Sequence, residues 1–140
     1  MFESTFALSD ASRSIAGIVL LTIVTIEFGG TFLVKVTSGK VPLTEFQKSF
    51  SRAGHGHAGV LVILSLIGLV LADATALTGF WGWIARAGVP LAAILMSGGF
   101  FAAMAGQGRT EPNKAIAILY LGAASLALGV VTLGIGLLAA

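Results

Sequence analysis

Two histidines stand one glycine apart where a charged segment gives way to a long apolar run. They are His55 and His57, the only histidines of the chain, in the stretch SFSRAGHGHAGVLVILSL. An imidazole nitrogen can bind a heme iron or a transition metal, and histidine exchanges protons near neutral pH. Ionisable groups at or within a membrane span are costly and usually have a function. The pair is therefore the first candidate site.

Glu27 is a third ionisable residue that falls inside an apolar run. At about 1.5 Å rise per residue, it lies about 13 Å from one end of its run, and His57 lies about 10 Å from the matching end of the next. If the two runs form antiparallel neighbouring helices, Glu27 can reach a histidine. His55, His57 and Glu27 are accordingly predicted as candidate metal ligands, with Glu27 and His57 as an alternative proton relay.

Helix geometry restricts how the two histidines work together. Residues two apart on an α-helix differ by about 200° in direction, so His55 and His57 would not grip one small ion. If the helix began only after Gly56, irregular backbone would let them converge. On a continuous helix, one faces Glu27 and the other a neighbouring helix, a second cofactor or another subunit. A purely structural role, with Arg52 extending to the surface, is the competing interpretation.

Four apolar runs must position these residues. Each is long enough to cross a bilayer core, which takes roughly 20 helical residues. Turn and loop residues such as Pro42, Gly79 and Pro112 separate them. The predicted spans are about 15–36, 50–72, 84–105 and 115–138. Residues 1–14 are expected at the membrane interface, with Phe2, Phe6 and Leu8 touching lipid.

The composition predicts the fold class. The chain has 140 residues, of which 56% are hydrophobic and 10% charged. A soluble domain of this size could not bury so much apolar surface. We therefore expect an all-α integral membrane protein, a single four-transmembrane-helix bundle over residues 1–140, in contact with the lipid bilayer. The absence of cysteine excludes disulfides and thiolate metal sites. Scattered basic residues give no nucleic-acid-binding face.

Lysine and arginine positions predict the orientation. Only Arg13 and Arg86 lie on the side of the N-terminus and the second connection. The others flank the first and third connections: Lys35, Lys40, Lys48, Arg52, Arg109 and Lys114. The positive-inside rule places those two connections in the cytoplasm and both termini outside, in the plasma (inner) membrane.

Further residues carry secondary expectations. Trp81 and Trp83 fall in the second connection, at the headgroup level. Asp73 and Arg86 lie at the outer boundary and are expected to be solvated. Small residues in the third and fourth spans, among them Gly99, Gly122 and Gly129, should let helices approach closely. Pro90 should kink the third helix.

The residues around the histidines carry a resemblance. A span with His-x-His followed by a Leu/Val/Ile run, after IEFGGTFLVKV in the first span, resembles small four-helix bacterial membrane proteins of uncharacterised function. Those proteins are distantly similar to the histidine-bearing helices of heme–copper oxidases. The resemblance implies His55 and His57 as axial ligands of heme b, and charge and depth suggest that Arg52 reaches propionates. With no further histidine, a three-histidine copper site cannot form within one chain.

A second resemblance concerns topology. Length, four spans and a basic connection running into SRAGHGHAG resemble the glutathione-using MAPEG membrane proteins. No Asn or Glu follows Arg52 in its span, as that family's motif would require.

Three function hypotheses follow. The first is a heme- or metal-binding redox or sensory module, or an accessory subunit of a respiratory complex. The second is a proton-coupled transporter, channel or pH sensor that uses Glu27 and His57. The third is a non-catalytic scaffold. Each suits a homo-oligomer or a subunit of a larger membrane complex. No nucleophile–base pair or phosphate loop favours an enzyme.

Overall fold

Four long helices make up the part of the chain that the structure describes. The computed structural model describes residues 7–140, and these contain no strand. Each helix is long and apolar enough to cross a membrane, which confirms the all-α fold with four candidate spans. Phe2 and Phe6, expected at the interface, lie outside the described residues. The helices are α1 (Asp10–Thr37), α2 (Glu45–Ala72), α3 (Gly79–Met104) and α4 (Ile116–Leu138).

The first three helices each begin about five residues before the predicted spans, at Asp10, Glu45 and Gly79. α2 begins at Glu45 because Thr44 and Gln47 form a capping box: the Gln47 N–H donates to Thr44 Oγ1, and the Thr44 N–H to Gln47 Oε1. α3 begins at Gly79, so the prediction that Trp81 and Trp83 lie in the connection is wrong. Both belong to the first turns of α3 and are exposed. The first turns of α2 and α3 contain polar and aromatic residues. A search for continuous apolar segments therefore leaves these turns out, although they are helical.

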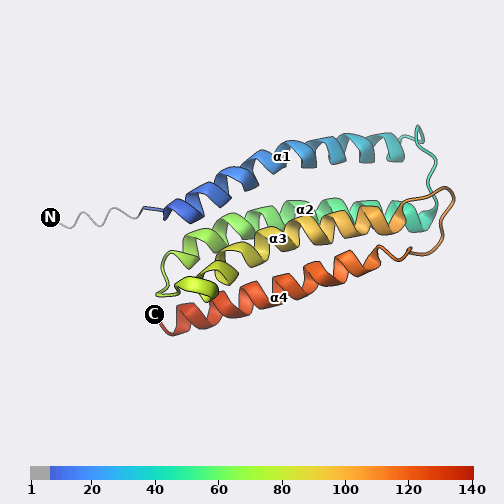
Figure 1. Cartoon of the computed structure of the whole chain (residues 1–140). Coiled ribbons are helices and arrows are strands. Elements are labelled where there is room, and N and C mark those ends of the chain that lie inside the picture. The colour runs from blue at the N-terminus through green and yellow to red at the C-terminus, as the bar shows by residue number, and fades with distance from the viewer. Residues whose placement is uncertain (1–6) are drawn as a thin grey trace.

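The helices lie side by side and run alternately up and down (Figure 1). α1 begins and α4 ends at one end of the bundle, beside the α2–α3 connection. The α1–α2 and α3–α4 connections lie at the opposite end. α1 sits at one edge and α4 at the other, so the two central helices, α2 and α3, carry contacts on both sides.

Close glycine contacts hold α3 against α4. A Cβ on Gly88 would lie 2.6 Å from the Gly129 Cα, and a Cβ on Gly122 would lie 2.6 Å from Met96 Cγ. The main core cluster comprises Leu61, Val89, Ala92 and Met96, with partly buried neighbours from α4. Small residues at helical spacing therefore let these backbones approach, as helices in lipid require.

α1 is attached to the bundle along a narrow strip. Only three residues of α1 are buried, namely Ser12, Val19 and Val36. Leu21 and Phe28 are 75% and 71% exposed. α1 thus covers part of α2 and α3 while presenting most of its own apolar surface outward.

Candidate ligand-binding site

His55 lies on α2 and faces a pair of glycines on α1. α2 is helical from Glu45, so the alternative in which a helix begins only after Gly56 does not arise. A Cβ added at Gly29 would come 3.2 Å from His55 Nδ1, and one at Gly30 would come 3.5 Å from Cε1. A Cβ at Gly29 would therefore crowd the imidazole, whereas one at Gly30 would make an ordinary van der Waals contact with it.

A cavity of about 490 Å³ opens beside His55 between α1, α2 and α3. This volume is within the range typical of small-molecule sites, about 300–1,000 Å³. The walls are mostly apolar, and His55 is the one ionisable residue among them. The lining residues are Thr22, Thr25, Ile26 and Gly29 of α1; His55, Ala58 and Val62 of α2; and Ala93, Ile94, Ser97, Gly98 and Phe101 of α3.

Some polar groups of this cavity have hydrogen-bond partners in the part of the chain that the structure describes, and others do not. Thr22 and Thr25 each donate to a carbonyl three residues back on their own helix, at 2.6 Å. The buried Ser97 hydroxyl finds no hydrogen-bond partner among the described residues. No side-chain hydrogen bond within residues 7–140 involves His55 either. The His55 imidazole is therefore available to a ligand.

His57 has different surroundings. Its Nδ1 lies 2.8 Å from the Ala53 carbonyl oxygen, which can only accept, so Nδ1 carries a proton and donates this hydrogen bond. The ring packs 4.9 Å from that of Phe100 on α3. His57 does not line the cavity beside His55. The two histidines thus serve two environments, as the 200° offset of a continuous helix dictates.

Glu27 does not join either histidine. It is exposed on α1, about 200° around the helix from the cavity-lining Gly29. Within residues 7–140 no group of three His, Asp or Glu side chains comes close enough to hold a metal ion. His55, His57 and Glu27 therefore do not assemble one metal site in the described chain. Within residues 7–140 no hydrogen bond or ion pair joins Glu27 to His57, the two residues of the predicted proton relay.

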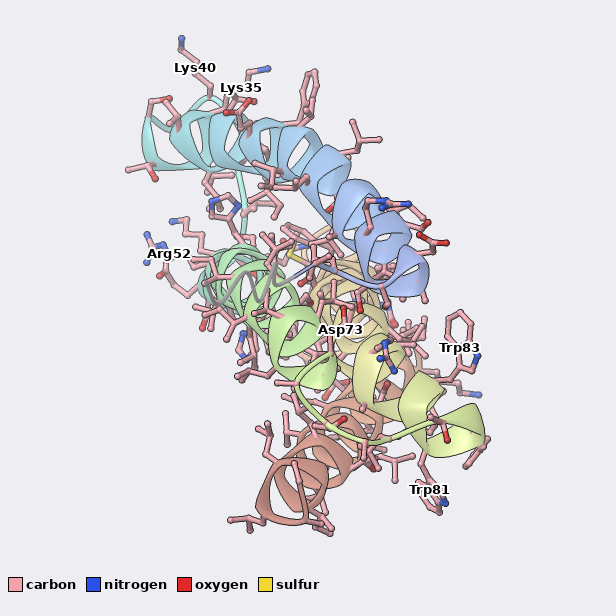
Figure 2. All side chains as sticks on the ribbon, turned by 90° about the vertical axis from the view of Figure 1, so that its left-hand side faces the viewer. Lys35, Lys40, Arg52, Asp73, Trp81 and Trp83 are labelled. Carbon is pink, nitrogen blue, oxygen red and sulfur yellow. The ribbon has the colours of Figure 1, made fainter. Side chains whose placement is uncertain are left out.

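Arg52 is exposed one turn before His55, towards the end of the bundle that carries the α1–α2 connection. Figure 2 shows it pointing outward, as do Lys35, Lys40 and the two tryptophans. Asp73, in the same view, lies among the helices.

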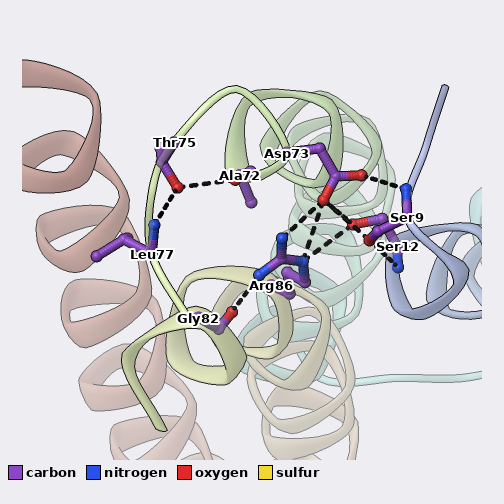
Figure 3. A network of polar contacts seen from close by, with 8 residues as sticks. All are labelled: Ser9, Ser12, Ala72, Asp73, Thr75, Leu77, Gly82 and Arg86. Atoms are coloured by element: carbon purple, nitrogen blue, oxygen red, sulfur yellow. Dashed lines mark hydrogen bonds and ion pairs between the residues drawn. The ribbon is translucent and has the colours of Figure 1, made fainter. Parts of the chain in front are cut away.

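A buried ion pair joins α2 to α3, and sequence reasoning missed it. Asp73 and Arg86 were expected to be solvated, but their side chains are 5% and 15% exposed, and Arg86 Nη2 lies 2.7 Å from Asp73 Oδ1. Ser9 donates to Asp73 from its N–H at 2.8 Å and from its hydroxyl at 2.9 Å. The Ser12 hydroxyl also donates, at 2.9 Å (Figure 3).

This network fastens the start of α1 to its neighbours. Burial raises the pKa of Asp73, but the hydrogen bonds from the Ser9 N–H, from Arg86 and from the two serine hydroxyls outweigh it and lower the pKa below its usual 3.8. An acid and a base at the same boundary of adjacent spans, with Ser-x-x-Ser before the first span, were the available signal. The two serines lie more than 60 residues from Asp73 along the chain, so the sequence alone did not indicate that they are in contact.

A second polar contact fastens the opposite end. The Gln47 side chain is buried and donates to the carbonyls of Met104 and Gly106 at 3.0 and 2.7 Å. The Thr44 hydroxyl donates to the Arg109 carbonyl. The beginning of α2 is thereby tied to the α3–α4 connection. The histidines and the cavity lie between these two fastened ends.

No known family model, curated protein or solved structure matches the chain.

Proposed function

We propose that this protein binds heme b in the cavity between α1, α2 and α3, where the His55 imidazole would hold the iron. The observation that carries the proposal is the His55 imidazole, which lacks a side-chain hydrogen bond among the described residues and lines a cavity of about 490 Å³. Such a protein would act as a redox or sensory module, or as an accessory subunit of a respiratory complex.

The residues present fit a heme with one histidine ligand. The walls are apolar, and Gly29 and Gly30 leave room for the ring of His55. Arg52 lies one turn closer to the polar end, where it would pair with propionates. Heme bound in this way supplies electron-transfer or gas-binding chemistry, and the polarity and access of the pocket decide between them. Two histidine ligands on one heme would require a second chain, because His57 lies outside this cavity.

Reconstitution with hemin tests this proposal. The wild-type protein should develop a saturable Soret band at one heme per chain. His57→Ala should keep the band, while His55→Ala should lose it, and the two variants control for each other because they sit on the same helix. No saturable band in the wild-type protein would refute heme binding. A band lost only in His57→Ala would refute the assignment to this cavity.

A scaffold or accessory subunit is the second candidate. The two interhelical polar networks, around Asp73–Arg86 and around Gln47, favour it because they lock helices rather than perform chemistry. Under this hypothesis the histidine variants would change assembly with a partner complex and leave its absorption spectrum unchanged.

We further propose that the α1–α2 and α3–α4 connections face the cytoplasm of a plasma-membrane protein, because six of the eight Lys and Arg residues flank them. With no native cysteine, single cysteines in either connection can be labelled by a membrane-impermeant maleimide. Labelling of intact cells there would reverse the proposed orientation.

A further inference from the structure

We infer that the outward face of α1 is an interface between two copies of this chain, with Glu27 at its centre. This inference does not depend on heme binding. The folded chain leaves the carboxyl group of Glu27 at an exposed position deep within an apolar helix.

The position of Glu27 makes its exposure unusual. It lies about 15 Å from the end of α1 at Thr37, at about 1.5 Å rise per residue. Within residues 7–140 no hydrogen bond or ion pair involves its side chain. Ionisable groups at such depth almost always face a protein interior or a water-filled cavity. Glu27 turns away from the cavity of its own chain, so another protein surface must receive it.

The rest of this face suits a packed helix partner. Its residues follow alternating steps of three and four, the spacing at which two helices meet at a shallow crossing angle. They are exposed, mostly apolar or small, and distinct from the strip that contacts α2 and α3. Together with Glu27 they form the outward face of α1: Gly17, Leu20, Val24, Thr31 and Val34. A Cβ on Gly17 would meet nothing within 4 Å, so a partner helix has room to approach there.

The chemistry of Glu27 favours a second copy as the occupant. A two-fold axis along the membrane normal brings the same residue of each copy to the same depth. Across this axis the two Glu27 carboxyl groups would face each other, and one proton shared between them would join them by a hydrogen bond. The lysines and arginines of the chain offer no alternative at this depth: they lie towards the helix ends, and Arg86 is paired with Asp73.

Disulfide trapping tests the geometry, and the chain is suited to it because it contains no cysteine. Val24→Cys and Leu20→Cys should form dimers on mild oxidation in liposomes. The matched controls are Val60→Cys on α2 and Leu121→Cys on α4, because both residues are about as exposed as Val24: 65% and 63% against 54%. They should stay monomeric. Equal trapping at a control position, or no trapping on α1, would overturn the inference.

Substitution of Glu27 tests the chemistry. Glu27→Gln keeps a group that donates and accepts, so self-association measured by energy transfer between labelled copies should change little. Glu27→Leu should weaken it about tenfold, the scale of one interhelical hydrogen bond. Association of Glu27→Leu at wild-type strength would overturn the central role of Glu27. Heme loading is measured by absorption and does not depend on either result. Each of the two proposals can therefore be refuted without refuting the other.

Discussion

At the scale of single residues, His55 and Gly29 form one unit across two helices. Replacing Gly29 by Val should push the His55 ring aside, because a Cβ at Gly29 already lies 3.2 Å from Nδ1. We expect the affinity for hemin to fall about tenfold, equivalent to about 1.4 kcal/mol. Gly17→Val on the same helix is the control, since its Cβ would meet nothing within 4 Å. Equal effects of the two substitutions on hemin titrations would argue against a specific contact.

Asp73 offers a second test at the residue scale. Asp73→Ala leaves the Arg86 guanidinium buried without its partner, so the free energy of unfolding should fall by about 3 kcal/mol. The fluorescence of Trp81 and Trp83, on the first turns of α3, reports unfolding at this end of the bundle. Asp10→Ala removes a comparable but exposed pair with Arg13 and should change little. A stability loss no larger than that of Asp10→Ala would show that the network is not structural.

The same carboxyl group predicts a pH dependence. Because the pKa of Asp73 is lower in the folded protein than its usual 3.8, the stabilisation is complete above that value and is lost as the pH falls through the folded-state pKa. The melting temperature of the wild-type protein should therefore drop below about pH 4. Asp73→Asn should start lower and lose less over the same range. Parallel curves for the two proteins would contradict the assignment.

At the scale of helices, the apolar runs predicted the number and order of the elements but not where they begin. The capping box at Thr44 and the tryptophan-bearing first turns of α3 are helical without being part of an apolar window. Hydropathy measures transfer to lipid, whereas helix starts are fixed by hydrogen bonds to the first N–H groups. The helical offset between His55 and His57 was predictable, because it depends on geometry alone.

Helix packing supplies a further prediction. Gly88→Val should separate α3 from α4, because a Cβ at Gly88 would fall 2.6 Å from the Gly129 Cα, where only backbone could yield. Overpacking of this kind costs about 1–3 kcal/mol, measurable by thermal or chemical unfolding in detergent. Gly134→Val on α4 is the control, since a Cβ there would meet nothing within 4 Å. Matching losses in both variants would indicate a general effect of valine in these helices.

At the scale of the whole molecule, the cavity exists because α1 is fastened near its ends and leaves space along its middle. The Asp73 network holds one end, and Val36 is buried near the other. The sequence could indicate His55 as a candidate but not the cavity, which depends on which helices are neighbours. The sequence predicted the depth of Glu27 along its helix. It did not predict that the side chain would be exposed, because the direction of the side chain depends on which face of α1 packs against α2 and α3.

The most direct test of the central claim is rescue of a ligand variant by free imidazole. His55→Gly should lose the Soret absorption of hemin-loaded protein, since it removes the ligand and leaves the rest of the cavity in place. Added imidazole should restore the band, while His57→Gly should need no rescue. If His55→Gly keeps the wild-type spectrum without imidazole, His55 is not the ligand and the account of this cavity is wrong.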